Sequence, residues 1–278
     1  LMMRFEIKPL TPSFGAELVG IDLSVRLDKE VICNIREAFL KYGVIFLRNQ
    51  KLTPDSQMRF ANYFGELLEY PFVDGLKKFP FVIPVLKRKY EEVNFGGIWH
   101  SDTAYLPEPP MGTILYAKKI PPIGGDTLFA DMYKAYETLS VGMKKILRGM
   151  RAVNSAANKK VSQTRVDRMR ESKKIMPNFS LENIHPVIRT HPETGRFALY
   201  INKAHTTRFD GMTAEESLPI LNYLFRHQVR QEFICRFQWS EGAIAFWDNR
   251  CTQHYPLNDY HGFSRLLHRV TLKGERPF

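Results

Sequence analysis

The chain has 278 residues, of which 44% are hydrophobic and 13% aromatic, so it can bury one large core, and we expect a single domain over residues 1–278. Its formal net charge of +11 admits nucleic acid, an anionic membrane surface or small anionic ligands as partners. No nucleic-acid-binding motif accompanies the charge and no apolar stretch is long enough to cross a membrane, so we expect a small anionic partner, no nucleic acid and no membrane. The three widely separated cysteines favour a cytoplasmic protein over a disulfide framework.

The first predicted elements alternate between helix and strand. Residues 27–42 place apolar side chains at helical intervals, Gly43 ends this pattern, and residues 44–47 form an apolar run typical of a buried strand. A second helix begins at Thr53 and Pro54, because threonine caps helices and proline suits their first turn. We expect both helices to pack outside a sheet.

From residue 111 onward the sequence becomes rich in strand patterns. One helix interrupts them over residues 213–230, where Thr213 and Glu216 have the spacing of a capping box. The simplest architecture is mainly β with flanking helices around an antiparallel, jelly-roll-like core. The predicted strands cover residues 111–117, 126–130, 187–190, 197–202, 233–239, 243–247 and 265–272.

Much of the positive charge lies in one segment, residues 159–174, which reads KKVSQTRVDRMRESKK. Such a charge run is most simply a solvated loop or an exposed helix face. A second interpretation makes residues 158–182 a mobile lid or insert that closes over an acidic substrate.

The triplet His100-Ser101-Asp102 is a candidate for two-thirds of a metal site. On a strand, its first and third side chains project to the same side, as two ligands of one metal require. Taken alone, a structural hydrogen bond between the two is the better explanation. His254, just after the predicted strand 243–247, supplies a third possible ligand and makes the metal site the favoured explanation. Two neutral imidazoles and one carboxylate make the arrangement typical of non-haem Fe(II) oxygenases, whereas a structural zinc site normally has four protein ligands.

The last predicted strand carries two arginines on one face. Period-two geometry puts Arg265, Leu267 and Arg269 on the same side, so two guanidinium groups can enter one cavity. Burying two such cations is costly unless anions meet them. If they face inward, a dicarboxylate and an acidic substrate are natural partners, because arginine pairs with carboxylates through two hydrogen bonds.

These motifs together resemble the taurine dioxygenase family, which also contains dioxygenases that cleave phenoxyalkanoate herbicides. The resemblance runs from about Ile7 to Phe278. It implies a double-stranded β-helix fold and an Fe(II)- and 2-oxoglutarate-dependent oxygenase that uses O2, hydroxylates a small anionic substrate and releases succinate and CO2. It also implies a homo-oligomer, a dimer or a tetramer. The motifs are residues 99–102 (WHSD), 124–127 (GGDT), 185–192 (HPVIRTHP), 247–250 (WDNR), 252–255 (TQHY) and 267–271 (LHRVT).

The resemblance assigns roles to individual residues. The family's iron ligands fall on three positions, and the threonine and arginine that hold the distal carboxylate of 2-oxoglutarate fall on two more. A further arginine matches the one that meets the substrate's sulfonate in the taurine enzyme. No catalytic residue is implied beyond the metal ligands. In that order, the positions are His100, Asp102, His254, Thr127, Arg265 and Arg269.

The substrate is expected to differ from taurine. Tyr70 and Gly96 stand where the taurine enzyme has a histidine and an asparagine, so two polar contacts to substrate are absent. With Phe72, Phe95 and Ile98 nearby, a less polar pocket is expected. We predict that it takes a sulfonate, a sulfate ester or a carboxylate such as a phenoxyalkanoate.

Three alternatives stay open: a taurine dioxygenase proper, a non-catalytic metal-binding protein of the same fold, and a basic nucleic-acid-binding protein. Thr127 and Arg265 favour a catalyst, since a bare metal site needs no clamp for a dicarboxylate. His185 and His191 precede prolines and are interpreted as turn residues, and Cys251 as a small hydrophobic residue. Aromatic residues that can keep water from the site, although each is more simply a core residue, are Trp99, Tyr105, Phe129 and Trp247.

Overall fold

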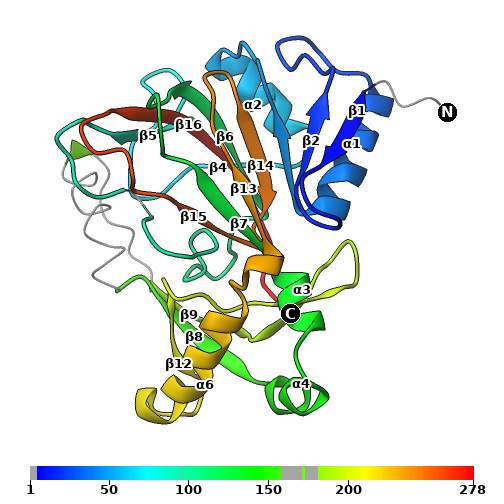
Figure 1. Cartoon of the computed structure of the whole chain (residues 1–278), viewed down its shortest axis with the longest axis vertical. Helices are drawn as coiled ribbons and strands as arrows, with labels where there is room; N and C mark the ends of the chain where they lie inside the picture. The colour runs from blue at the N-terminus through cyan, green and yellow to red at the C-terminus, as the bar shows by residue number, and fades with distance from the viewer. Residues whose placement is uncertain (1–4, 95, 158–170, 173–180) are drawn as a thin grey trace.

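Two sheets face each other across an apolar layer and form the core of the protein. The structure, a computed structural model, describes residues 5–94, 96–157, 171–172 and 181–278 (Figure 1). Most of the predicted lid or insert, residues 158–182, therefore lies outside the described residues. Within the described residues, no helix is both long and apolar enough to span a bilayer.

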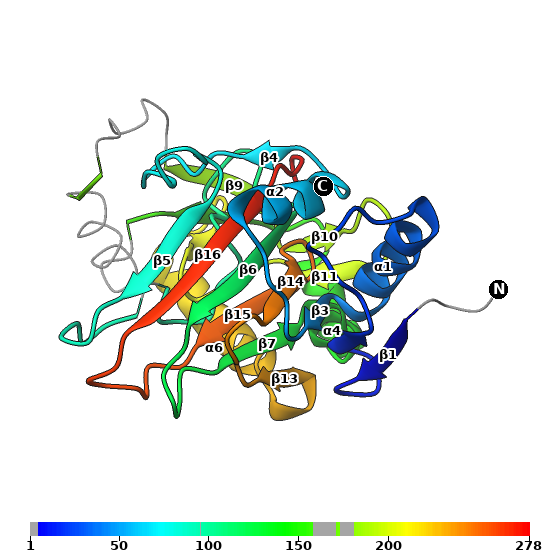
Figure 2. The same cartoon turned by 90° about the horizontal axis from the view of Figure 1, so that it is seen from above.

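The larger sheet has eight strands in the order β1-β2-β3-β14-β6-β16-β4, with β5 paired to β16. All its pairs are antiparallel except β2 with β3, and its central strands lie side by side in Figure 2. The bounds of its strands are β1 Glu6–Pro9, β2 Ala16–Val19, β3 Val44–Leu47, β4 Leu67–Leu68, β5 Ile83–Lys87, β6 Gly112–Lys119, β14 Ile244–Asp248 and β16 Arg265–Leu272.

The smaller sheet has the order β13-β7-β15, with bounds Ile234–Phe237, Thr127–Asp131 and Thr252–Pro256. Side chains from both sheets form one buried cluster, in which Phe46 of β3 stacks on Phe237 of β13 at 4.1 Å between ring centroids. Phe129 of β7 likewise packs on Trp247 of β14 at 5.6 Å. The prediction of a mainly β protein with a jelly-roll core is confirmed, since alternating apolar residues of the two sheets meet in this layer.

Two helices cover the outer face of the larger sheet, as predicted. They are α1 Lys29–Tyr42 and α2 Pro54–Asn62. Gly43 ends α1 with a φ of 70°, a left-handed conformation that glycine adopts without steric cost, and its N–H donates to the Phe39 carbonyl. Thr53 caps α2 through a complete capping box with Ser56. The Phe39 ring stacks on Phe246 of β14 at 4.1 Å and so seals the helix layer to the sheet.

A third group of elements lies at the end of the sandwich, at the bottom of Figure 1. It shares a buried cluster with residues of β7 and of the turn after β14. Its helix α6 begins with the predicted capping box of Thr213 and Glu216. The members are α3 Met132–Glu137, α4 Val141–Leu147, β8 Arg151–Ser155, β9 Glu182–Pro186, β10 Ile188–Thr190, β11 Phe197–Leu199, β12 Thr206–Phe209, α6 Ala214–His227 and the short 3-10 helix η1 Gln231–Phe233.

All eight predicted strands, residues 44–47 and the seven from residue 111 onward, and the three predicted helices are present, with ends shifted by three residues or fewer. The prediction that only one helix interrupts the strands after residue 111 is wrong, because α3 and α4 follow β7. Both are short, six and seven residues, and each begins at a single capping side chain, Asp131 and Ser140. The sequence patterns also miss eight strands, β1, β2, β4, β5, β8, β9, β12 and β15.

Candidate active site

His100, Asp102 and His254 meet in one buried group. The backbones of His100 and His254 form an isolated antiparallel bridge, with reciprocal N–H to carbonyl bonds of 3.1 and 2.9 Å, so their rings lie 4.1 Å apart. Asp102 Oδ1 lies 3.7 Å from His100 Nε2 and 3.8 Å from His254 Nε2. The three ligand atoms all lie within 4.8 Å of one another, which is close enough for one cation between them.

The route by which the chain achieves this geometry differs from the predicted one. His100 and Asp102 do not lie on a continuous strand, because the chain turns after Ser101, and Thr103 has a φ of 42°. His254 lies inside β15 rather than in a loop after β14. The two histidines are therefore brought together by the bridge between distant segments, and the turn swings Asp102 toward them.

Neighbouring groups fix the orientation of each imidazole. His100 Nδ1 donates to the Ile98 carbonyl at 2.7 Å, which leaves the lone pair of Nε2 facing Asp102. His254 packs between Trp247, at 4.5 Å between ring centroids, and Phe129, at 6.1 Å and nearly parallel. These two aromatic residues thus shield the group from water, whereas Trp99 packs on Tyr255.

The protonation states suit a divalent cation. Burial lowers the pKa of His100, and burial together with the His100 ring lowers the pKa of His254 to about 3. Burial alone would raise the pKa of Asp102, but electrostatic interactions with His254, the Arg269 guanidinium and His100, and the hydrogen bond from the Thr113 hydroxyl, bring it to about 2. At neutral pH the group therefore offers two neutral imidazoles and one carboxylate, the donor set that fits Fe(II).

Thr127 and Arg265 form a second polar group inside the sandwich. Arg265 Nη2 lies 3.4 Å from Thr127 Oγ1, which also accepts a 2.9 Å bond from Trp239 Nε1. The guanidinium is buried, lies over the Trp239 ring at 5.5 Å, and has no carboxylate within 4.0 Å among the described residues. Its Nε has no hydrogen-bond partner among them either. A buried cation in this state is costly, and a carboxylate of a ligand would satisfy it.

The two arginines of β16 both point inward, as the period-two argument predicts, since Arg265, Leu267 and Arg269 are all buried. Arg269 lies close enough to the metal group to lower the pKa values of His100, Asp102 and His254. Its guanidinium lies 4.3 Å from the centre of the Tyr70 ring. Together with Tyr70 it lines a small cavity whose other walls are apolar, formed by Val73, Ile83, Pro84, Val85 and Leu86.

Gly96 lies directly against the first candidate ligand. A side-chain Cβ at this position would lie 2.8 Å from His100 Cε1, and the φ of Gly96 is 74°. Only glycine therefore lets the backbone approach the imidazole this closely. Ile98 holds the same imidazole through its carbonyl, and Phe95 lies outside the described residues.

The sequence patterns did not reveal His205. This buried histidine lies with its ring 6.4 Å from that of His100 and 4.9 Å from that of Tyr105. Asn202 orients it by accepting from its backbone N–H, and the Asn202 amide also donates to Ser101, between the two candidate ligands. No spacing in the sequence connects residue 205 with residue 100, so only the fold places it here.

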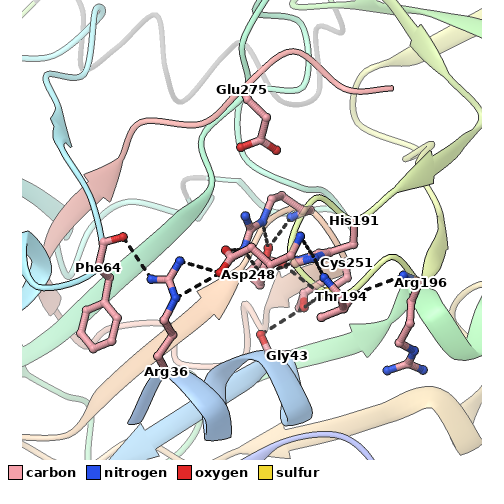
Figure 3. Close-up of polar contacts among 12 residues, drawn as sticks. Arg36, Gly43, Phe64, His191, Thr194, Arg196, Asp248, Cys251 and Glu275 are labelled. Carbon is pink, nitrogen blue, oxygen red and sulfur yellow. Dashed lines mark hydrogen bonds and ion pairs between the residues drawn. The ribbon is translucent and has the colours of Figure 1, made fainter. Parts of the chain in front are cut away.

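A second group with metal-ligand chemistry, His191, Asp248 and Cys251, is a structural ion-pair network (Figure 3). His191 Nδ1 accepts two backbone N–H bonds, so its Nε2–H donates to Asp248 at 2.9 Å. Arg250 donates to both oxygens of Asp248 at 2.8 and 2.7 Å. The guanidinium neutralises the carboxylate and occupies its lone pairs, and burial raises the pKa of the Cys251 thiol, so this group is a poor site for a cation.

Comparisons with known proteins agree with this geometry. The family model described as "Taurine catabolism dioxygenase TauD, TfdA family" matches residues 6–271. The chain is 33% identical to an alkylsulfatase of Acinetobacter baylyi, over 98% of this chain and 86% of that protein. It is 31% identical to an alpha-ketoglutarate-dependent sulfate ester dioxygenase of Pseudomonas putida, over 99% and 91% of the two chains. A crystal structure of a taurine dioxygenase from Burkholderia xenovorans superposes with a TM-score of 0.84 and 34% identity, covering 99% of this chain and 91% of that one.

Proposed function

The chain belongs to the taurine catabolism dioxygenase TauD, TfdA family, and from this premise we propose that it hydroxylates sulfate esters with Fe(II), 2-oxoglutarate and O2. The enzyme is a 2-oxoglutarate-dependent dioxygenase, an oxidoreductase that acts on a small anionic substrate. The observation that carries the proposal is the group of His100, Asp102 and His254 with its two neutral imidazoles and one carboxylate.

The protein's own residues would bind and orient the reactants. His100 Nε2, His254 Nε2 and Asp102 Oδ1 would hold the iron from one side. Thr127 and Arg265 would hold the distal carboxylate of 2-oxoglutarate, which supplies the anion that the buried guanidinium lacks. Bound Fe(II) with 2-oxoglutarate supplies the activation of O2 that oxidises a substrate C–H bond while succinate and CO2 are released.

The substrate class follows from the surroundings of Arg269. Its buried guanidinium is a cation that can pair with a sulfate, and the small cavity that it lines with Tyr70 has otherwise aliphatic walls, which favour an apolar group next to the anion. A hydroxyl placed on the carbon that carries the sulfate oxygen gives an unstable product. It breaks down to an aldehyde and hydrogen sulfate, with one oxygen atom of O2 in the aldehyde hydrate or carbonyl and the other in succinate.

The alternatives fit less well. Taurine needs a partner for its ammonium group, and the described walls of the cavity beside Arg269 carry no carboxylate. A non-catalytic metal-binding protein would have no use for a buried Arg265 that has no carboxylate partner among the described residues, and the relatives are named as dioxygenases. Membership of this family also argues against a nucleic-acid-binding protein.

Three further proposals concern the whole molecule. We propose one domain, a cytoplasmic location and a homo-oligomer, either a dimer or a tetramer. Size-exclusion chromatography with light scattering measures the oligomeric state, and a monomer at micromolar concentration would contradict that proposal.

The function is tested by incubating the protein with Fe(II), 2-oxoglutarate and hexyl sulfate, taurine or phenoxyacetate, and measuring succinate and sulfate. We expect equal amounts of succinate and sulfate with hexyl sulfate and little succinate with taurine. His100→Ala should abolish both products while circular dichroism shows an unchanged fold, and His261→Ala, an exposed histidine, serves as the matched control. Turnover of taurine alone would overturn the substrate assignment, and full activity of His100→Ala would overturn the iron site.

A further inference from the structure

Asp102 is held at its backbone and at its carboxylate by one chain of buried polar groups. Trp247 Nε1 donates to Asn249 Oδ1 at 2.9 Å, and Asn249 Nδ2 donates to Thr113 Oγ1 at 3.0 Å. The Thr113 hydroxyl then donates to Asp102 Oδ2 at 2.6 Å. The Asp102 backbone N–H donates to Asn249 Oδ1 at 3.2 Å, so the contacts form a closed ring.

The direction of every bond in this chain is determined by its first member. An indole N–H can only donate, so the Asn249 amide must present its oxygen to Trp247 and its NH2 group to Thr113. The threonine oxygen accepts that bond, and its single proton is left to point at the carboxylate. Each bond therefore polarises the next, and the chain ends in a short bond to an ionised oxygen.

This chain of hydrogen-bonded side chains lies in the core, so its members have no room to move if the Asp102 carboxylate changes its position. The side chains of Thr113, Trp247 and Asn249 are at most 1% exposed. Asn249 N–H donates to the Met111 carbonyl at 2.9 Å, which ties the β14–β15 turn to the start of β6. The neighbouring Asp248 is fixed by the ion-pair network of Figure 3, so the turn is held from both sides.

We propose that Thr113 and Asn249 are positioning residues that hold Asp102 as a one-oxygen ligand. Asp102 Oδ1 is the oxygen that lies 3.7 and 3.8 Å from the two imidazole Nε2 atoms, whereas Oδ2 carries the hydrogen bond from Thr113. A carboxylate that bound the metal with both oxygens would have to share Oδ2 between the metal and the Thr113 hydroxyl, which weakens both contacts. It would also fill one of the positions that the cosubstrate and O2 require.

This role rests on the proposed metal site, and its test uses the metal alone. Thr113→Val removes the hydroxyl and leaves Asn249 Nδ2 and Asp102 Oδ2 without their partner, whereas Thr113→Ser keeps the hydroxyl. Thr113→Ala is a second variant that adds no methyl group to the core. Thr271→Val is the matched control, because Thr271 lies opposite Thr113 in the β6–β16 register and no hydrogen bond of the described residues joins it to Asp102.

Co(II) binding is measured by calorimetry without 2-oxoglutarate, together with the visible absorption of bound Co(II) and the circular dichroism of each metal-free variant. We expect Thr113→Val and Thr113→Ala to bind Co(II) roughly 10- to 100-fold more weakly than the wild type and with a changed absorption band. Thr113→Ser should retain both properties, and Thr271→Val should match the wild type.

The outcomes separate this role from the metal site itself. Wild-type affinity and an unchanged band in a folded Thr113→Val or Thr113→Ala variant would overturn the positioning role and leave the metal site intact. Equal weakening by Thr271→Val would overturn it as well, since the effect would then come from the strand and not from the hydroxyl. Absence of Co(II) binding to the wild-type protein would overturn the proposed metal site and this role with it.

Discussion

Replacing Arg265 by methionine is expected to stabilise the ligand-free protein and to remove its response to 2-oxoglutarate. The guanidinium is buried, and the side-chain hydrogen bond that it makes among the described residues goes to a neutral group, the hydroxyl of Thr127. Burial lowers the pKa of Arg265, which reflects the cost of keeping this cation away from water. Methionine has a similar length and an adaptable shape, so it can fill the space without a charge.

The two effects have opposite signs and can be estimated separately. Apolar replacement of buried ionic groups often stabilises by about 1–4 kcal/mol, and the lost contacts with Thr127 and Trp239 offset about 1–2 kcal/mol of this. The midpoints of the two ranges give a net gain of about 1 kcal/mol, or roughly 2–4 °C in Tm. Loss of two charge-assisted hydrogen bonds to the distal carboxylate costs about 3–6 kcal/mol, which weakens 2-oxoglutarate binding by roughly 100-fold or more.

The assay is thermal unfolding with and without 2-oxoglutarate, in the presence of Mn(II). At about 100 times its Kd the cosubstrate stabilises the wild type by about 2.7 kcal/mol, whereas Arg265→Met should gain almost nothing. Arg230→Met, at an exposed arginine, is the matched control and should change neither quantity. A lower Tm for ligand-free Arg265→Met, or a wild-type response of this variant to 2-oxoglutarate, would refute the reasoning.

Two further predictions concern groups beside the site. Gly96→Ala should weaken Mn(II) binding at least tenfold (roughly 1.4 kcal/mol), because its Cβ would displace the His100 ring. Gly195→Ala, which is also at a positive φ but has nothing within 4 Å of its added Cβ, should bind Mn(II) like the wild type. Equal calorimetric affinities of the two variants for Mn(II) would refute this prediction. Burial lowers the pKa of His185 to about 4, so the unfolded chain takes up a proton at this residue at a higher pH than the folded protein does. The stability that the neutral imidazole contributes is therefore present above pH 6.5 and is lost as the pH falls toward 4. The free energy of unfolding falls in this window by up to about 1.4 kcal/mol per pH unit. His185→Gln, which can still donate to the Leu106 carbonyl, should therefore show a shallower loss of urea stability between pH 6.5 and 4, and parallel curves would contradict this.

Elements with a repeated pattern could be predicted from the sequence, and elements defined by a single residue could not. The strand 265–272 was predicted with both ends correct, because its alternating residues face one layer of the core. The capping box of Thr213 and Glu216 makes both of its expected hydrogen bonds. In contrast, α3 is too short to show a helical period, and β5 contains Pro84, a residue that argues against a strand.

The same distinction applies to the site. Period-two geometry is sufficient to place Arg265 and Arg269 on one inward face. The contacts of Thr113 and His205 depend on how distant segments pack, which no local pattern contains. The interpretation of His185 as a turn residue was wrong, since it lies in β9 and hydrogen-bonds to Leu106, whereas His191 does organise its turn by accepting two backbone N–H bonds.

The central claim is tested most directly by the anomalous scattering of Mn(II) in crystals of the protein grown with 2-oxoglutarate. We expect one strong peak at roughly 2.0–2.3 Å from Nε2 of His100, Nε2 of His254 and Oδ1 of Asp102, with the distal carboxylate of the cosubstrate on Arg265. A peak at His191, Asp248 and Cys251 instead, or a cosubstrate carboxylate that does not reach Arg265, would contradict the account.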